Sequence, residues 1–303
     1  MKSFFALALA GVASATLMEK LDYEFMKYLS AFNKRYSTVE EFEVRKDLYK
    51  KAEKEIQEHN ASGAKSTMGH NIFSDWTEEE FNDLMGFRAA EPLGEGQDFN
   101  FEPTTETEVD WVAKGAVTEV KNQGTCGSCW SFSTTGSMEG AHFIATGELL
   151  SLSEQELVDC SHNGNLGCMG GMMDRAFKWT ETKPLETEAD YPYSGWAGVI
   201  KGCRYDQSKG KVAVQSYVDV TPQNSEALKA AIAKGPVSVA IQANQKVFQR
   251  YTGGVISADC GTQLDHGVLA VGYGTDTDGT PYYKVKNSWG AGWGEDGYVR
   301  LAI

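Results

Sequence analysis

The stretch QGTCGSCW, residues 123–130, holds two cysteines, Cys126 and Cys129, in a C-x-x-C spacing. Apolar residues recur at helical spacing from Phe132 to Ile144, which predicts a helix that begins at Cys129. The N-terminus of a helix favours negative charge, and a cysteine is a nucleophile only as the thiolate. The stretch therefore predicts a nucleophilic cysteine, Cys129, at the start of a helix.

Two other uses of a C-x-x-C pair fit the chain less well. A zinc site needs a second C-x-x-C or a pair of histidines at ligand spacing, whereas Cys160 and Cys168 stand eight residues apart. A thioredoxin-like redox pair needs a βαβ context, which the flanking pattern lacks. We therefore expect no metal and no organic cofactor. A disulfide oxidoreductase acting through Cys126 and Cys129 remains a rival, and it would reduce disulfides without hydrolysing peptides.

The run from Cys126 to Trp130, CGSCW, matches the local signature of the papain and cathepsin nucleophile. The chain resembles a papain-type cysteine protease of the cathepsin L-like branch. The resemblance implies that His266, 137 residues beyond Cys129, is the base. It implies that Asn287 orients the imidazole and that Trp289 shields their hydrogen bond. It further implies that the Gln123 amide and the Cys129 backbone N–H stabilise the oxyanion.

The same resemblance implies a substrate cleft. Gly170 and Gly171 would offer backbone hydrogen bonds to an extended peptide. The pocket for the second residue before the cut would be formed by Met172, Met173, Ala240, Leu264 and the neighbouring Asp265, with Trp289 further along the cleft. Because these side chains are mostly apolar, we expect a preference for a hydrophobic or aromatic residue at this position. No inserted loop carries a pair of histidines, so an endopeptidase is expected.

The resemblance also implies the pairing of the cysteines. Cys126 would be bonded to Cys168 and Cys160 to Cys203, while Cys129 stays a thiol. In relatives the partner of Cys260 lies in a C-terminal tail, beyond the Asn-Ser-Trp-Gly motif at residue 287. The chain ends at Ile303, so we expect a truncated sequence that lacks this tail and part of the pocket floor.

Composition and the N-terminus place the protein in the secretory pathway. The 303 residues carry a net charge of −14, which argues against nucleic acid or an anionic membrane as a partner. Residues 4–12 are apolar and end on Ala13-Ser14-Ala15, which predicts a signal peptide over residues 1–15. The run is too short to span a bilayer. We expect a lysosomal, vacuolar or extracellular protein in which disulfides form.

Residues 16–105 predict a small helical domain without cysteine. Helical repeats occur at residues 25–32 and over 41–60, where Val44, Leu48, Ala52 and Ile56 share one stripe. Two spaced motifs, from Glu41 to Asn60 and from Gly69 to Asp75, resemble those of inhibitory cathepsin L-like propeptides. Tyr49 and Ala52 depart from the first motif. A short extended piece at 68–73, a short helix at 77–85 and a linker over 89–107 complete this segment.

Residues 106–303 predict the peptidase domain. Its first half is helical, with helices beginning at Cys129, after a capping box at Ser153–Glu156, and over 172–180. A helix over 225–234 precedes strands at 237–243, 266–273, 281–286 and 298–302, with a hairpin turn at Asp278-Gly279. Helices first and strands later predict an α+β protein, here a two-lobed papain-like fold with one helical and one β-rich lobe.

These features together predict a secreted zymogen of a monomeric cysteine endopeptidase. It would cleave proteins and peptides through a thioester on Cys129, with its own propeptide as an intramolecular inhibitor. The alternative is an inactive truncated form that inhibits related proteases through the propeptide. Residues 1–105 and 106–303 each carry a net charge of −7, so ion pairs between them must be local. We expect acid to protonate paired carboxylates and to loosen the prosegment.

Overall fold

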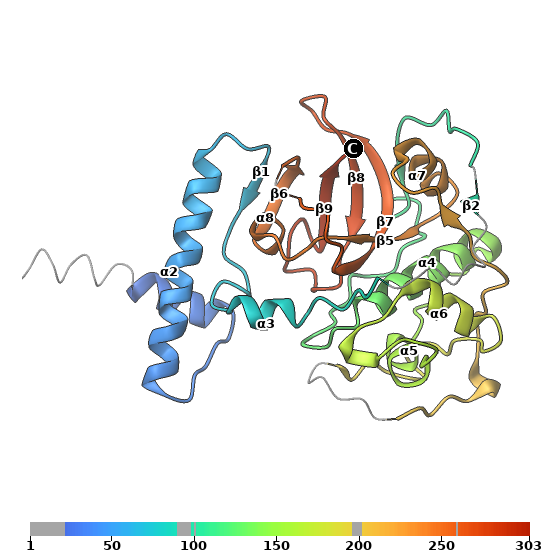
Figure 1. Ribbon diagram of the computed structural model, residues 1–303, viewed down its shortest axis with the longest axis horizontal. Helices are drawn as coiled ribbons and strands as arrows, with labels where there is room; N and C mark the ends of the chain where they lie inside the picture. The colour runs from blue at the N-terminus through green and yellow to red at the C-terminus, as the bar shows by residue number, and fades with distance from the viewer. Residues whose placement is uncertain (1–21, 90–97, 100, 196–201, 259) are drawn as a thin grey trace, which may run out of the picture.

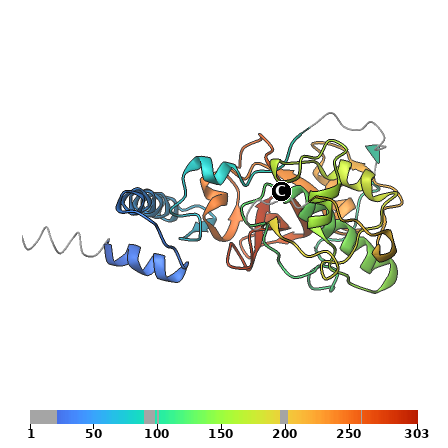
Figure 2. The same cartoon turned by 90° about the horizontal axis from the view of Figure 1, so that it is seen from below.

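The computed structural model describes residues 22–89, 98–99, 101–195, 202–258 and 260–303 (Figure 1). The predicted leader and residues 90–97 and 100 of the predicted linker lie outside these ranges. The structure divides into a prosegment, a helical lobe and a β-rich lobe. The two N-terminal helices of the prosegment lie at the edge of the β-rich lobe, and its third, short helix packs against that lobe (Figures 1 and 2).

The prosegment is built from two crossing helices with an aromatic core. Residues 22–31 are helical, and α2 runs over Val39–Ala61 behind the N-cap Thr38. Phe25, Tyr28 and Tyr49 form the core between them. The predicted stripe on α2 is partly wrong, because Val44 is exposed and Tyr49 replaces it on the buried face. The helix turns its larger aromatic face, not its aliphatic one, toward the other helix.

The rest of the prosegment runs onto the β-rich lobe. Strand β1, Ser66–Met68, pairs antiparallel with β6, Tyr251–Ile256, so the prosegment adds an edge strand to the sheet. Helix α3, Glu78–Asn82, follows with a capping box between Thr77 and Glu80. Beyond it the chain passes between the lobes. In the linker, β2, Asp98–Phe99, pairs with β4, Asp219–Val220, which was not predicted.

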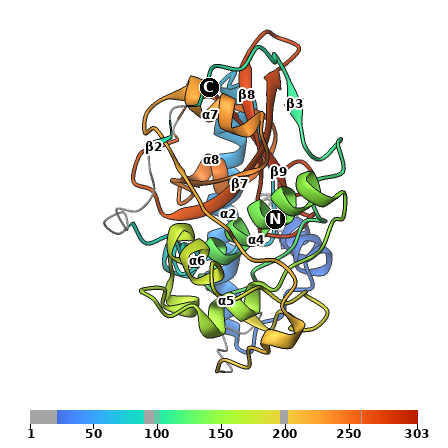
Figure 3. The same cartoon turned by 90° about the vertical axis from the view of Figure 1, so that its right-hand side faces the viewer.

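The helical lobe packs around the long helix α4, Cys129–Thr146, with α5, Glu154–Cys160, the short 3-10 turn η1, Gly167–Met169, and α6, Met173–Thr180 (Figure 3). Trp130, Leu152 and Leu157 lie in its core. The predicted capping box is half formed. The Ser153 hydroxyl accepts the backbone N–H of Glu156, whereas the Glu156 carboxylate accepts the N–H of Glu186 instead of the N-cap.

The β-rich lobe is one sheet with the strand order β1-β6-β9-β8-β7-β3, in which β5 also pairs with β7. Its bounds are β3 Val109–Asp110, β5 Val237–Ile241, β7 His266–Thr275, β8 Pro281–Lys286 and β9 Tyr298–Ala302. Helix α7, Ser225–Ile232, matches its prediction, and α8, Lys246–Gln249, and β6 were missed. The described ranges hold no helix both long and apolar enough to cross a bilayer.

Candidate active site

Cys129 lies at the first turn of α4, where that helix meets β7. Its side chain is fully buried, and its sulfur accepts the backbone N–H of Gly267 at 3.3 Å. Burial raises the pKa of the Cys129 thiol to about 11, against the opposing effect of the backbone N–H groups of Gly267 and Gly86. Burial therefore outweighs these N–H groups, and one of them, that of Gly86, belongs to the prosegment that lies over the sulfur.

His266 is the first residue of β7 and is also fully buried. Its Nε2 lies 2.8 Å from Oδ1 of Asn287; the oxygen accepts, so Nε2 carries the proton. Among the described residues, Nδ1 has no hydrogen-bond partner, which leaves it able to receive one. Burial lowers the pKa of His266 to about 4, although the bond to Asn287 acts in the opposite direction.

Trp289 covers this histidine. Its ring centroid lies 4.8 Å from that of His266, at an interplanar angle of 33°. Phe248 and Trp293 meet the other parts of the indole edge-on, and so do Phe73 and Phe81 of the prosegment. The prosegment thus docks on the aromatic group that shields the His266–Asn287 hydrogen bond.

The Gln123 side chain is held at both ends. Its Oε1 accepts the Ser288 hydroxyl at 2.8 Å, which directs the amide nitrogen the other way. That nitrogen donates to the backbone carbonyls of Cys126 at 2.9 Å and of Leu84 at 3.0 Å. Leu84 lies in the prosegment, so a backbone carbonyl occupies the position where the resemblance places the oxyanion.

The prosegment crosses the cleft as an extended strand. Phe87 forms a parallel bridge with Gly171, whose N–H donates to Gly86 O at 2.8 Å and whose carbonyl accepts from Arg88 N at 3.0 Å. A Cβ on Gly170 would lie 2.7 Å from Arg88 Cγ, and this glycine has a positive φ of 111°. Gly170 therefore lets the strand approach closely, while Gly171 makes the hydrogen bonds.

Phe87 lies near residues that were predicted to form the substrate pocket. It packs against the core of the helical lobe, which includes Met173 and has Ala240 at its margin. The backbone N–H of Phe87 donates to Asp265 O at 2.9 Å, whereas the Asp265 carboxylate turns away to accept the N–H of Ala243. Leu264 is 49% exposed and Met172 is half-buried.

Four of the other five cysteines form disulfides. Cys126 is bonded to Cys168, and Cys160 to Cys203. The thiol of Cys260, on the surface, donates to the carbonyl of Ala258. No group of three or more histidine, cysteine or acidic side chains in the described ranges is arranged to hold a metal ion.

Several contacts at the site were not predicted. The sequence has a glycine followed by an aromatic residue, Gly86-Phe87, between a predicted helix and the linker. This pattern could have indicated that the prosegment contacts the site there, as Leu84, Gly86 and Phe87 do. Tyr193, whose hydroxyl donates to Gln123 O at 2.8 Å, and Ser288 carry weaker signals. A hydroxyl group that bonds to a distant loop cannot be recognised from the residues next to it in the sequence.

A buried cysteine at a helix N-terminus, a histidine oriented by an amide and an amide donor beside them define the site of a thiol-dependent hydrolase. Family comparison agrees. Residues 105–303 match the model for papain family cysteine proteases, and residues 25–81 match the cathepsin propeptide inhibitor domain. The chain belongs to the papain family of cysteine proteases and carries the propeptide domain of its zymogens.

Individual relatives support this membership. The chain is 42% identical to a cathepsin L-like peptidase of Aedes aegypti, over 98% of this chain and 93% of that one. It is 43% identical to cysteine protease XCP2 of Arabidopsis thaliana, covering 93% of this chain and 81% of the relative. It is 44% identical to cysteine proteinase RD21A of Arabidopsis thaliana over 84% of this chain, but spans only 56% of that longer relative.

Solved structures confirm the predicted two-lobed α+β fold with its propeptide. Digestive procathepsin L 3 from the larval midgut of Tenebrio molitor superposes with a TM-score of 0.83 at 37% identity, covering 93% of each chain. The recombinant stem bromelain precursor gives a TM-score of 0.83 at 33% identity, over 93% of this chain and 92% of that one. Both are precursors, as this chain is.

Proposed function

We propose that this chain is the zymogen of a cysteine endopeptidase, with a signal peptide over residues 1–15, an inhibitory propeptide over 16–105 and a peptidase domain over 106–303. The observation that carries the proposal is the placement of Cys129 beside the start of β7, where Asn287 holds His266. A papain-family protease needs a nucleophile and a base brought together from distant parts of the chain. Cys129 and His266 stand 137 positions apart in the sequence, and the N–H of Gly267, next to His266, donates to the Cys129 sulfur.

The proposed reaction proceeds in steps that these side chains carry out in turn. Once the prosegment leaves, Nδ1 of His266 takes the thiol proton, because Nε2 is bound to Asn287. The Cys129 thiolate then attacks the peptide carbonyl. Its oxygen becomes negative and is bound by the Gln123 amide and the Cys129 backbone N–H. His266 protonates the leaving amine, a thioester remains on Cys129, and water hydrolyses it.

The position of Phe87 supports a preference for a hydrophobic or aromatic residue at the second position before the cut. Phe87 packs against the apolar cluster that contains Met173, and Ala240 packs against the same cluster, so this region accommodates a benzyl side chain in the zymogen. A substrate that pairs with Gly171 would direct a side chain to the same place. The enzyme is proposed to act as a monomer in a lysosome, a vacuole or outside the cell, on protein and peptide substrates.

The test is the intact mass of the purified precursor before and after acidification, with a thiol-directed epoxide inhibitor added. Loss of the prosegment and one adduct mapped to Cys129 are the expected results. Cys129→Ser and His266→Ala should each abolish turnover of a peptide substrate. An unchanged mass without an adduct would refute the protease. Inhibition of a related protease by the intact chain would then support the alternative, an inhibitor that acts through its propeptide.

A further inference from the structure

A second cavity opens on the helical lobe, and its lining includes none of the residues assigned to the substrate cleft. It has a volume of about 560 Å³, and its wall includes Lys121, Phe132, Leu149, Glu154, Glu188 and Tyr193. None of the prosegment residues in the described ranges lines it. The cavity is therefore accessible in the zymogen as well as in the mature enzyme.

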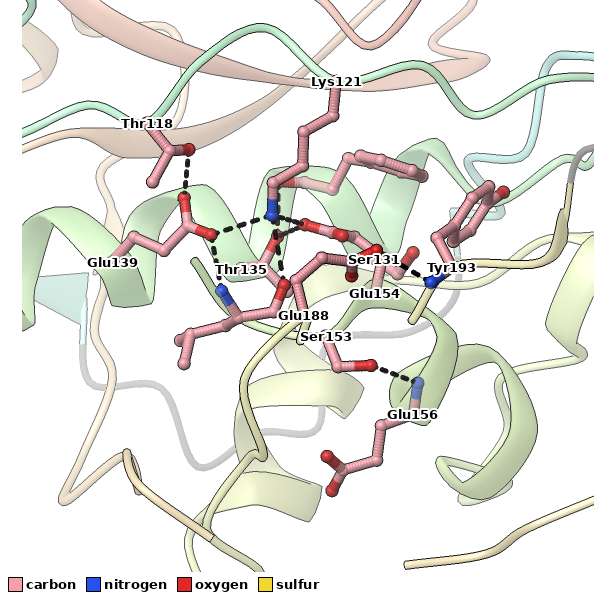
Figure 4. Close-up of polar contacts among 12 residues, drawn as sticks. Thr118, Lys121, Ser131, Thr135, Glu139, Ser153, Glu154, Glu156, Glu188 and Tyr193 are labelled. Atoms are coloured by element: carbon pink, nitrogen blue, oxygen red, sulfur yellow. Dashed lines mark hydrogen bonds and ion pairs between the residues drawn. The ribbon is translucent and has the colours of Figure 1, made fainter. Parts of the chain in front are cut away.

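The floor of this cavity is a buried network around Lys121 (Figure 4). The ammonium group donates to Glu139 at 3.0 Å, to the carbonyl of Leu152 at 3.1 Å and to Oε1 of Glu154 at 2.6 Å. Thr135 donates to the same Glu154 oxygen. With three acceptors, the lysine charge is fully engaged. Lys121 therefore leaves the other oxygen of Glu154 uncompensated.

That second oxygen, Oε2 of Glu154, is buried and receives no hydrogen bond from any described residue. The whole Glu154 side chain is inaccessible to water. A buried carboxylate oxygen without a donor is costly, because it has lost its hydration and gained nothing in exchange. The cavity adjoins this side chain, because Glu154 forms part of its wall.

Glu188 repeats this arrangement on the same wall. Its Oε1 accepts the backbone N–H of Tyr193 at 2.7 Å, and its Oε2 is buried without a donor among the described residues. Burial and the neighbouring Glu154 carboxylate raise the pKa of Glu188 to about 7. Two adjacent carboxylates thus each present one unsatisfied oxygen, and a cationic donor would satisfy both.

The remaining wall is apolar. The rings of Phe132 and Tyr193 meet edge-on with centroids 5.0 Å apart, and Leu149 lies at the rim with 37% of its surface exposed. Pockets that hold small molecules combine such walls with a few polar groups that orient the ligand. Here the polar groups are mostly acidic, since Glu119, Glu154 and Glu188 line the wall beside the engaged Lys121.

We propose that this cavity binds a small organic cation, with its ammonium or guanidinium group between Glu154 and Glu188 and its apolar stem against Phe132 and Leu149. The site is separate from the substrate cleft and does not depend on the proposed peptidase activity. A lysine or arginine side chain of a docked protein carries the same chemistry as a free amine. The experiment below distinguishes these two sources.

The test is calorimetric titration of the full-length Cys129→Ser chain, which cannot process itself, with phenethylamine and with its neutral counterpart 2-phenylethanol. Phenethylamine should bind and 2-phenylethanol should bind at least tenfold more weakly, because only the amine donates a charged hydrogen bond. Equal binding of the two would overturn the proposal. Absence of amine binding would also overturn it and would mean that the two carboxylates share a proton only.

Substitutions locate the binding. Glu188→Gln should weaken phenethylamine binding roughly tenfold or more, whereas the same change at Glu226 on α7 should leave it unaltered. Leu149→Arg, at the exposed rim, should abolish binding by placing a guanidinium in the site, and it leaves the buried network intact. Wild-type affinity in both cavity variants would place the amine elsewhere and refute the site. Acetyl-lysine methylamide distinguishes the sources: tighter binding than phenethylamine assigns the site to a protein side chain, weaker binding to a free amine.

Discussion

A substitution of Gln123 can distinguish an effect on the chemical step from an effect on substrate binding. The amide is aimed by Ser288 and would stabilise only the charged intermediate. Gln123→Ala should therefore lower kcat by roughly 10²–10³-fold with little change in KM. Steady-state kinetics of the activated enzyme measure both constants, and Gln207→Ala, in an exposed turn of the same lobe, is the control. A change confined to KM would contradict the oxyanion role.

Tyr193 positions the loop that carries Gln123. Its hydroxyl donates to Gln123 O at 2.8 Å and lies 2.7 Å from the hydroxyl of Ser128, the residue before the nucleophile. Tyr193→Phe should lower kcat about threefold to tenfold, the value of a modest hydrogen bond, with KM nearly unchanged. Tyr217→Phe is a matched control, because the Tyr217 hydroxyl has no hydrogen-bond partner among the described residues. Equal effects of the two changes would argue against the positioning role.

Sequence reasoning reaches some of these residues and not others for a physical reason. Cys129 was placed by a local motif, and His266 and Asn287 by their resemblance to a known spacing. Ser288 and Tyr193 could not be placed in this way. Their hydroxyls meet Gln123 from 165 and 70 residues away. Contacts of that kind depend on loop packing, and any hydroxyl-bearing residue on the right loop would leave the same pattern in the chain.

At the scale of the element, the inhibitory strand depends on Gly86. A Cβ at this position would lie 1.9 Å from Gly127 O, and backbone atoms cannot move aside as a side-chain end can. Gly86→Ala should therefore weaken the hold of the prosegment on the cleft and shorten the half-time of precursor conversion at least tenfold. Electrophoresis of the precursor over time at one pH gives the half-time. Gly292→Ala, where a Cβ meets open space, should leave it unchanged.

The docking of helix α2 depends on one carboxylate. Glu55 pairs with Lys246 and, at 2.6 Å, with Arg250, whose side chain is only 7% exposed. Glu55→Gln leaves a buried guanidinium without its counter-charge, which is strongly destabilising. The variant precursor should convert at least about tenfold faster at pH 5 than the wild type. Glu58→Gln, which breaks an exposed pair on the same helix, is the control, and equal rates would refute this role of Glu55.

The sequence predicts that acid loosens the prosegment by protonating paired carboxylates. One ion pair between the prosegment and the sheet can be excluded from this role. Lys65 pairs with Asp278 at 3.0 Å. The Thr280 hydroxyl, followed by Lys65, holds the pKa of Asp278 at about 2, below its usual 3.8. A depressed pKa contributes stability that is complete above pH 3.8 and is lost only as pH falls through 2. This pair therefore persists at pH 4–6, and Asp278→Asn should not shift the pH at which the precursor converts; a shift would make it part of the trigger.

For the whole molecule, the order of helices and strands predicted the two lobes, while the connection between prosegment and enzyme could not be predicted. The pairing of β1 with β6 joins residues that stand about 190 positions apart, and three residues of strand carry too little pattern to name a partner. The apolar repeat over residues 132–144 does not mark the buried face of α4 either, since Ile144 is exposed whereas Ser133, Thr134 and Gly136 are buried. Small residues let α4 lie close to β7 and β5. Hydropathy does not predict this, because the residues at the contact are small rather than apolar.

The stability of the whole molecule should depend on buried carboxyl groups of the helical lobe. Burial, with a smaller effect from Glu186, raises the pKa of Glu156 to about 8, and burial raises that of Asp174 to about 6. Carboxyl groups with a raised pKa contribute stability that is complete below about pH 4 and is lost as pH rises through the folded value. His266 acts oppositely, because its lowered pKa adds stability as pH rises from about 4 to 6.5. Above pH 6.5 the histidine no longer compensates.

We therefore predict that the melting temperature of the full-length Cys129→Ser chain falls as pH rises from 6.5 to 8. Glu156 alone would lower the free energy of unfolding by up to about 1.4 kcal/mol per pH unit in this window, because the folded state keeps a proton that the unfolded state has lost. Glu156→Gln removes that proton exchange, so calorimetry across the same pH range should give a flatter profile. Glu148→Gln, exposed on the loop after α4, should keep the wild-type slope. A slope unaltered by Glu156→Gln would show that the instability arises from groups other than this buried carboxyl.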